Sequence, residues 1–263
     1  MKRFLCIIIL LVFLIFMYAK YIEPNQIVIN EYKISNNKIP SSFEGIKIAH
    51  FSDILYDSEN DYKQIEIVTQ KIQELNADII VFTGDLVQKK INENEKNELT
   101  SILTNLKPNL YKYAVLGDHD SNDVKDILKT SGFIVLENTS TYLFYESNEP
   151  ILIAGGDNIT SDSLLKDENI PYNFKIALTH KPDNYDSLKN EFNLVLAGHS
   201  LGGEIRIPFY GATIKKEGAK KYTDKMYSHE DNYLYISSGI GIEKTGLRLL
   251  NKPSINVYRL YNK

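Results

Sequence analysis

Cysteine is almost absent from this sequence, and its scarcity excludes a disulfide framework. The only cysteine, Cys6, lies in an apolar N-terminal run, so no intrachain disulfide can form. Because the rest of the chain carries no thiol, it tolerates export to an oxidising compartment. Tryptophan is absent altogether, and we attach no functional meaning to that absence.

A large excess of charge is also missing, which bears on the partners of the chain. The formal net charge is −4 over 263 residues, so no general attraction to nucleic acid is expected. The chain contains no internal repeat or low-complexity tract. With 43% hydrophobic residues it is long enough for one large globular domain with a real core.

The N-terminus carries the longest apolar run. Lys2 and Arg3 precede sixteen uncharged residues, Phe4–Ala19. A spanning helix needs about 17–25 residues, so this run crosses a membrane only if Lys20 extends toward the interface. The two N-terminal charges favour a cytoplasmic N-terminus. We therefore predict a single-pass signal anchor at residues 1–23 in the cell membrane, with the rest of the chain outside the cytoplasm.

A cleaved signal peptide is the alternative reading of the same run. The best candidate cleavage site follows Ala19, and cleavage there would place the bulky Met17 at a position that prefers a small residue. An uncleaved anchor is therefore favoured. Residues 24–43 read as a linker that contains one strand, and residues 44–263 read as the domain.

Beyond the linker, apolar runs alternate with helical spacing. Helices are predicted at 62–75, 95–106 and 123–129, between strands at 46–51, 79–82 and 111–116. This order implies a mostly parallel sheet with right-handed crossovers. The second half is rich in strands, which we expect at 133–136, 141–145, 151–154, 174–178, 194–197, 204–207, 233–236 and 255–260.

Polar motifs follow the predicted strands, at the edge where open α/β sheets bind their ligands. They are Ser52-Asp53-Ile54-Leu55, Thr83-Gly84-Asp85-Leu86, Gly117-Asp118-His119-Asp120, Thr179-His180-Lys181-Pro182-Asp183 and Gly198-His199-Ser200-Leu201-Gly202-Gly203. Together they resemble the calcineurin-like metallophosphoesterases, whose pattern runs Asp-x-His, Gly-Asp, Gly-Asn-His-Asp/Glu, a lone His and Gly-His-x-His. The stretch from Leu196 to Pro208 and the turn Ser237-Ser238-Gly239-Ile240-Gly241 are similar to the membrane-associated or secreted bacterial branch.

The resemblance implies an α/β fold in which two mixed β-sheets pack face to face with helices outside (αββα). It also implies a site for two divalent ions, in which Asp85 bridges both. The second ion would be held by Asp85, Asp118, His180 and His199, a donor set that suits Mn, Zn or Fe. Asp118 departs from the family pattern, which has asparagine there, and an added carboxylate would strengthen a lone second ion.

The first ion would take Asp53 and the residues at 55 and 201. Both of these family histidines are leucine here, and leucine offers no lone pair to a metal. We therefore expect the first ion to be absent or very weakly bound, leaving one ion per chain.

Three further roles are implied by the resemblance. His119 stands at the position of a general acid for the leaving group. Asp120 would orient His119 or cap the following helix. Asp53 would orient the attacking water or remain as a leftover of the first site.

Two functions from different classes remain open. The first is a membrane-anchored phosphoesterase that hydrolyses a phosphomonoester or phosphodiester, with a lipid-linked or cell-wall substrate suggested by its location. The second is a catalytically impaired homologue that binds metal or phosphate, or acts as a scaffold at the membrane. The intact second site favours the first, whereas Leu55 and Leu201 favour the second.

Overall fold

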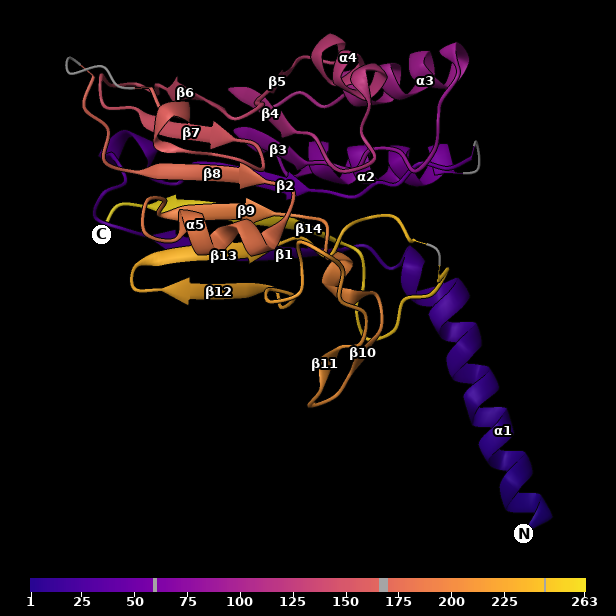
Figure 1. The fold of residues 1–263 in the computed structure, drawn as a ribbon. Coiled ribbons are helices and arrows are strands. Elements are labelled where there is room, and N and C mark those ends of the chain that lie inside the picture. Colours follow the sequence, from indigo (N-terminus) through magenta and orange to yellow (C-terminus); the bar gives the residue numbers. More distant parts are fainter. Residues whose placement is uncertain (59–60, 166–169, 244) are drawn as a thin grey trace.

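Two six-stranded sheets pack face to face in the computed structural model, which describes residues 1–58, 61–165, 170–243 and 245–263 (Figure 1). Helices cover the outer faces. The arrangement confirms the predicted αββα sandwich of two mixed sheets.

The first sheet contains the predicted parallel βαβαβ unit. Its order is β1 (Val28–Ser35), β14 (Ser254–Tyr261), β2 (Lys47–Phe51), β3 (Ile79–Thr83), β4 (Tyr111–Val115) and β5 (Phe133–Val135). Neighbouring strands are parallel except at the β14–β2 pair, which is antiparallel and makes the sheet mixed. The crossover helices are α2 (Tyr62–Glu74), α3 (Glu93–Thr104) and α4 (Asn122–Thr130).

The second sheet has a parallel centre with an antiparallel strand at each edge. Its order is β12 (Met226–His229), β13 (Asn232–Ile236), β9 (Leu194–Ala197), β8 (Lys175–Thr179), β7 (Ile151–Gly155) and β6 (Thr139–Leu143). The short helix α5 (Tyr185–Leu188) lies beside β9. The predicted strand at 204–207 forms only β10 (Arg206–Ile207), which pairs with β11 (Gly211–Ala212) in a separate small hairpin.

Three apolar layers follow from the alternation of side chains along the strands. One lies between the first sheet and α2–α4, and includes Phe51, Phe82 and Leu99. The second fills the space between the two sheets, and the third lies under α5.

The segment 24–43, expected as a linker, is part of the folded domain. Its strand β1 pairs with β14 along the whole length from Val28 to Ser35. The alternation of this strand was visible in the sequence, but its partner lies at the other end of the chain, so local pattern did not show that it closes a sheet edge.

The N-terminal helix α1 (Lys2–Met17) extends away from both sheets (Figure 1). Helical turns continue to Asn25, so the segment Lys2–Asn25 is 24 residues long and apolar enough to cross a membrane. All residues of α1 are exposed, so this helix contributes nothing to the cores of the two sheets.

The buried His50 on β2 should make the stability of the fold sensitive to acid. The ring is fully buried, and its nitrogens lie 2.8 Å from the Thr83 hydroxyl and 3.2 Å from the Tyr258 hydroxyl. Burial lowers the pKa of His50 to about 3. The unfolded chain takes up this proton near pH 6.5 and the folded chain does not. The stabilising contribution is therefore complete above pH 6.5 and is lost as the pH falls toward 3.

The expected slope is about 1.4 kcal/mol of unfolding free energy per pH unit below pH 6.5. His50→Phe should flatten the dependence between pH 6.5 and 4, whereas the exposed His229→Phe should not. Urea unfolding in detergent with chelator, at several pH values, measures both. Parallel slopes for wild type and His50→Phe would contradict this prediction.

Candidate metal centre

The polar motifs meet where strands of both sheets end. Asp53, Asp85 and Asp118 follow the C-termini of β2, β3 and β4, while His180 and His199 follow β8 and β9. The parallel strands of one sheet thus supply the carboxylates, and those of the other sheet supply the imidazoles. Only the packing of the two sheets brings these groups together.

The backbone at these motifs is held in an unusual conformation. Asp53, Leu55, Asp85, His199 and Leu201 all have left-handed φ values, between +49° and +63°. Such residues cost of order 1–3 kcal/mol each and persist where the surroundings over-determine them, typically at functional sites.

Gly84 allows the close approach that joins the two halves of the centre. A Cβ at this position would lie 2.6 Å from the amide nitrogen of Gly117 and 2.8 Å from Nδ1 of His180. Its φ of +87° also favours glycine. A side chain here would therefore push β3 away from both the Asp118 loop and His180.

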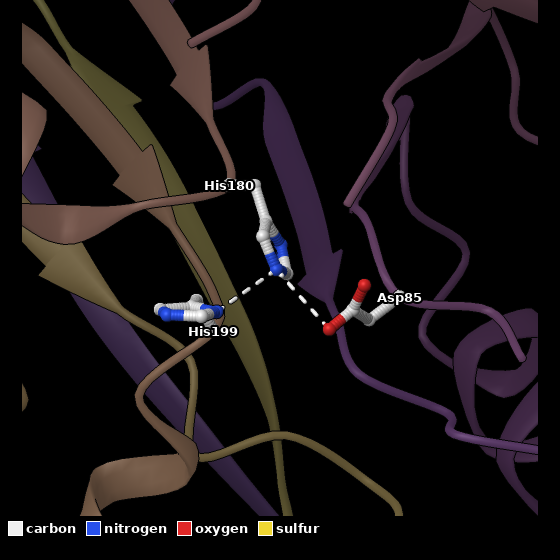
Figure 2. Close-up of side chains that lie close together, drawn as sticks. All are labelled: Asp85, His180 and His199. Atoms are coloured by element: carbon white, nitrogen blue, oxygen red, sulfur yellow. Dashed lines mark hydrogen bonds and ion pairs between the residues drawn. The ribbon is translucent and has the colours of Figure 1, made fainter. Parts of the chain in front are cut away.

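Asp85, His180 and His199 form a buried cluster whose ligand atoms lie within 4.8 Å of one another (Figure 2). His180 stands in the middle. Its Nε2 lies 3.2 Å from Oδ2 of Asp85 and 3.1 Å from Nδ1 of His199. Three of the four predicted ligands of the second ion are thus brought together.

Both imidazoles have their outer nitrogens fixed by backbone carbonyls. Nδ1–H of His180 donates to the Thr83 carbonyl at 2.7 Å, and Nε2–H of His199 donates to the Glu217 carbonyl at 2.7 Å. The inner nitrogens, Nε2 of His180 and Nδ1 of His199, therefore face each other at 3.1 Å, and either a proton or a metal ion must lie between them. Metal-ligating histidines are oriented in the same way by outer partners. The donor set fits one divalent ion.

The electrostatics of the cluster place one proton on His180. Burial alone would lower the pKa of His180, but the hydrogen bond and charge of Asp85, together with Asp53, raise it to about 10. Burial likewise favours the protonated form of Asp85, but its bonds to His180 and His119 bring its pKa below the ordinary range. Burial, and then the positive charge of His180, lower the pKa of His199. An ion entering this site must displace the proton.

Asp118, the fourth predicted ligand, lies at the edge of the cluster. Its Oδ2 is 3.8 Å from Nδ1 of His199, whereas its Oδ1 pairs with the Lys181 ammonium at 2.5 Å. The side chain is partly exposed, unlike the other three. Lys181 thus holds Asp118 beside the site, an ion pair that the sequence motif alone did not indicate.

Asp53 is buried and its carboxylate is engaged by neighbouring groups. The backbone N–H of His199 donates to both oxygens, at 3.0 and 3.1 Å, and the Ser52 hydroxyl donates to Oδ2. Burial raises the pKa of Asp53, although His180 opposes that shift. In the structure Asp53 therefore fixes the loop that carries His199, and it is not among the clustered ligands of the described residues.

His119 is oriented by Asp85 and not by Asp120. Its Nδ1 lies 3.0 Å from Oδ2 of Asp85, and its backbone N–H donates to Oδ1 of Asp85 at 2.9 Å. The ring is 44% exposed, so it faces the open side of the centre.

Asp120 instead bridges two loops. Its carboxylate accepts the backbone N–H groups of Asp85, Leu86 and Gly117, each at 2.8 Å. Its predicted contact with His119 is replaced by these three bonds, which hold the β3 and β4 loops in register.

Leu55 and Leu201 fill the region of the first ion with apolar side chains. Both are buried, at 3% and 0% exposure. A Cβ at Gly239 would lie 2.3 Å from Cδ2 of Leu201 and 3.0 Å from Cβ of Asp53, so the glycine-rich turn is what leaves room for the leucine. The two leucines keep the left-handed backbone of the motif without its metal-binding chemistry.

Arg248 provides a buried positive charge on this same side. Its guanidinium is fully buried and donates to the carbonyls of Ser238, Gly241 and Asn251. Burial lowers its pKa to about 10, whereas the nearby carboxylates of Glu204 and Asp53 oppose that shift. The side chain therefore stabilises the glycine-rich turn behind Asp53. Sequence motifs did not single it out.

Two further residues were missed because their partners are distant in sequence. Asp157 accepts from the Thr179 hydroxyl and from the backbone N–H of His180, and so anchors the loop after β8. Lys216 donates to the His199 carbonyl at 3.1 Å and pairs with Glu243 at 2.6 Å. Each positions one of the two histidines from outside the motif that contains it.

Comparison with known proteins agrees with this geometry. A family model described as calcineurin-like phosphoesterase matches residues 46–203, the range that contains every residue of the cluster. The uncharacterized metallophosphoesterase YkuE of Bacillus subtilis is 32% identical over 259 residues, which cover 92% of this chain and 88% of the relative.

Some of the other relatives carry named activities. Phosphodiesterase YaeI of Escherichia coli is 24% identical, with 93% of this chain and 92% of the relative covered. UDP-2,3-diacylglucosamine pyrophosphatase LpxG of Chlamydia muridarum is 22% identical, with 94% of this chain and 93% of the relative covered. These two relatives are phosphoester or phosphoanhydride hydrolases by name.

Proposed function

Because the chain belongs to the calcineurin-like phosphoesterase family, we propose that it is a membrane-anchored phosphoester hydrolase that works with one divalent ion. The observation that carries the proposal is the pair of inner imidazole nitrogens of His180 and His199, which face each other beside Asp85 and can both bind an ion that displaces the His180 proton. Residues 1–23 serve as the anchor, with the N-terminus in the cytoplasm and the domain outside it.

The ion is held by Asp85, His180 and His199, with Asp118 completing the set from the edge. These nitrogen and carboxylate donors suit Mn, Zn or Fe. A divalent ion at this point supplies Lewis-acid polarisation of a phosphoryl oxygen. For Asp118 to serve as a ligand, the Lys181 ammonium must share or release its carboxylate.

The surrounding residues orient the reacting groups. His119 is held by Asp85 through Nδ1, and its exposed ring is placed to protonate the leaving oxygen as a general acid. Asp53 and Asp120 act as positioning residues, since backbone N–H groups occupy their carboxylates. The substrate is a phosphoester, and a lipid-linked one is supported by the apolar helix α1 and by the substrate in the name of LpxG.

A second candidate function is favoured by the buried Leu55 and Leu201. Without the first ion, both activation of the attacking water and neutralisation of the phosphoryl charge are weakened. The chain would then be an impaired homologue that binds metal or phosphate at the membrane without turnover.

Ion stoichiometry and turnover separate these functions. The full chain in detergent should contain close to one divalent ion by elemental analysis, and should hydrolyse an aryl phosphodiester when Mn or Zn is added. Leu55→His with Leu201→His should bind two ions and raise the rate, because two imidazoles return to the first site.

Each outcome has a defined meaning. Two ions in the wild type would contradict the one-ion centre. One ion without turnover, against both monoester and diester substrates, would favour the binding protein. A double variant that binds one ion at an unchanged rate would show that repacking around Gly239 has closed the first site.

A further inference from the structure

The tip of the β10–β11 hairpin presents apolar side chains to solvent. Phe209 is fully exposed, Tyr210 is 76% exposed and Ile207 is 51% exposed. Single exposed apolar residues are common, but three adjacent ones on a projecting hairpin form a patch, which marks an interaction surface. Figure 1 shows this hairpin and α1 projecting from the same side of the sandwich.

The backbone at the tip is strained. Phe209 has a φ of +67°, a conformation that is a genuine outlier for a bulky residue. The Phe209 side chain is fully exposed and packs into none of the hydrophobic cores. Strain retained in order to display an aromatic ring outward indicates that the ring has a partner.

The β10–β11 hairpin is connected to the end of the anchor through one loop. The backbone N–H of Arg248 donates to the Ala19 carbonyl at 2.9 Å, and that of Asn251 donates to the Glu23 carboxylate. Between them, Leu249 forms a parallel bridge with Ile205. The loop 248–251 therefore contacts the anchor through its first and last residues. Between them, Leu249 contacts the residue just before the hairpin.

The surface between anchor and tip is continuous. A cavity of about 590 Å³ is lined by Tyr18 and Glu23 of the anchor, and a neighbouring one of about 420 Å³ is lined by the hairpin tip. Both cavities share Arg206, Asp224 and Leu250, and Leu250 is itself 58% exposed. The first cavity also reaches the cationic side chains of Lys225 and Lys252, which suit anionic head groups.

We propose that the β10–β11 tip inserts into the interface of the same bilayer that holds α1, with Phe209 and Tyr210 among the lipid head groups. Aromatic side chains favour this region, and interfacial elements bury about 5–10 Å into it. The proposal rests on the membrane anchoring proposed above and not on hydrolysis. The loop carrying His199 runs directly into β10, so this second contact sets the orientation of the metal centre relative to the membrane.

Because the chain has no tryptophan, Phe209→Trp gives a single fluorescent reporter. The full chain is reconstituted in phospholipid vesicles, with or without lipids brominated at shallow acyl positions. We expect a blue-shifted emission that loses intensity in brominated vesicles. Phe144→Trp is the matched control, since Phe144 is 43% exposed just beyond β6, across the molecule from α1 (Figure 1). Its emission should be neither shifted nor quenched.

Tyr210→Trp repeats the measurement and guards against a local effect at position 209. Unquenched, water-like emission from both tip reporters would overturn the proposal. Blue-shifted emission that brominated lipid does not quench would also overturn it, because a protein surface would then cover the tip. Carbonate extraction of the same vesicles tests α1, and release of the chain would remove the anchoring premise while leaving the metal centre and hydrolysis untouched.

Discussion

Asp85→Asn is expected to abolish divalent-ion binding and to reduce phosphodiester hydrolysis to background. Asp85 is the carboxylate that contacts both His180 and His119. An amide of the same size preserves the packing and the acceptor for the His119 N–H, but it removes the negative charge that holds a cation. The fold should therefore persist while the centre fails.

The expected losses are large. Removing an outer partner of a ligand typically costs about 10- to 100-fold in metal affinity, and a direct ligand should cost more. A bound ion stabilises the charge of the transition state by several kcal/mol. Because each 1.4 kcal/mol of activation free energy changes the rate about tenfold, the rate of hydrolysis should fall by at least about 100-fold.

Isothermal titration calorimetry with the divalent ion measures the loss of metal affinity. The rate of diester hydrolysis at saturating substrate measures the loss of activity. The control is Asp186→Asn, which removes a carboxylate of the same type from a surface ion pair with Lys221. It should leave affinity and rate unchanged. Unaltered metal affinity in Asp85→Asn would mean that Asp85 is not a ligand, and the assignment of the centre would be wrong.

Arg248→Met is expected to lower the free energy of unfolding by about 3–5 kcal/mol, because each buried carbonyl left without a donor costs about 1–3 kcal/mol. Methionine keeps the length and apolar stem of the side chain but none of its donors. The carbonyls of Ser238, Gly241 and Asn251 would be left without their guanidinium partner. The carboxylates of Glu204 and Asp53 would lose a nearby cation.

Urea unfolding of the full chain in detergent at pH 7 measures the loss. Arg259→Met is the matched control, because Arg259 pairs with Glu31 at the surface, where ion pairs contribute only about 0.2–1 kcal/mol. Equal effects of the two substitutions would show that the buried guanidinium is not a structural centre of the glycine-rich turn.

Hydrophobic periodicity was sufficient to predict most of the helices and strands of this chain. Helices at 62–75 and 123–129 and the strands around 79–82 and 194–197 are found within one or two residues of their predicted bounds. Each reflects a contiguous stretch whose apolar residues must face one core, and that information is local. The short α5, β11 and β12 were not predicted, since two to four residues carry too little pattern.

The sequence also predicted which residues would gather at the strand ends. Asp85, His180 and His199 do converge, because parallel strands place the residues after their C-termini on one edge. Local pattern could not show that Lys181 takes one oxygen of Asp118 or that Asp85 takes the His119 ring. Such contacts depend on side-chain directions across loops.

By itself, the sequence determined the order of the elements, the apolar N-terminal helix and the set of residues that can hold an ion. Only the tertiary structure decided that β1 closes the first sheet beside β14, that Arg248 lies buried behind Asp53, and that two backbone carbonyls turn His180 and His199 toward each other. The physical reason is range. Hydrophobic periodicity and strand ends depend on residues that are neighbours in the sequence. Strand pairing, side-chain burial and the orientation of the histidine rings depend on groups that meet only when the two sheets pack.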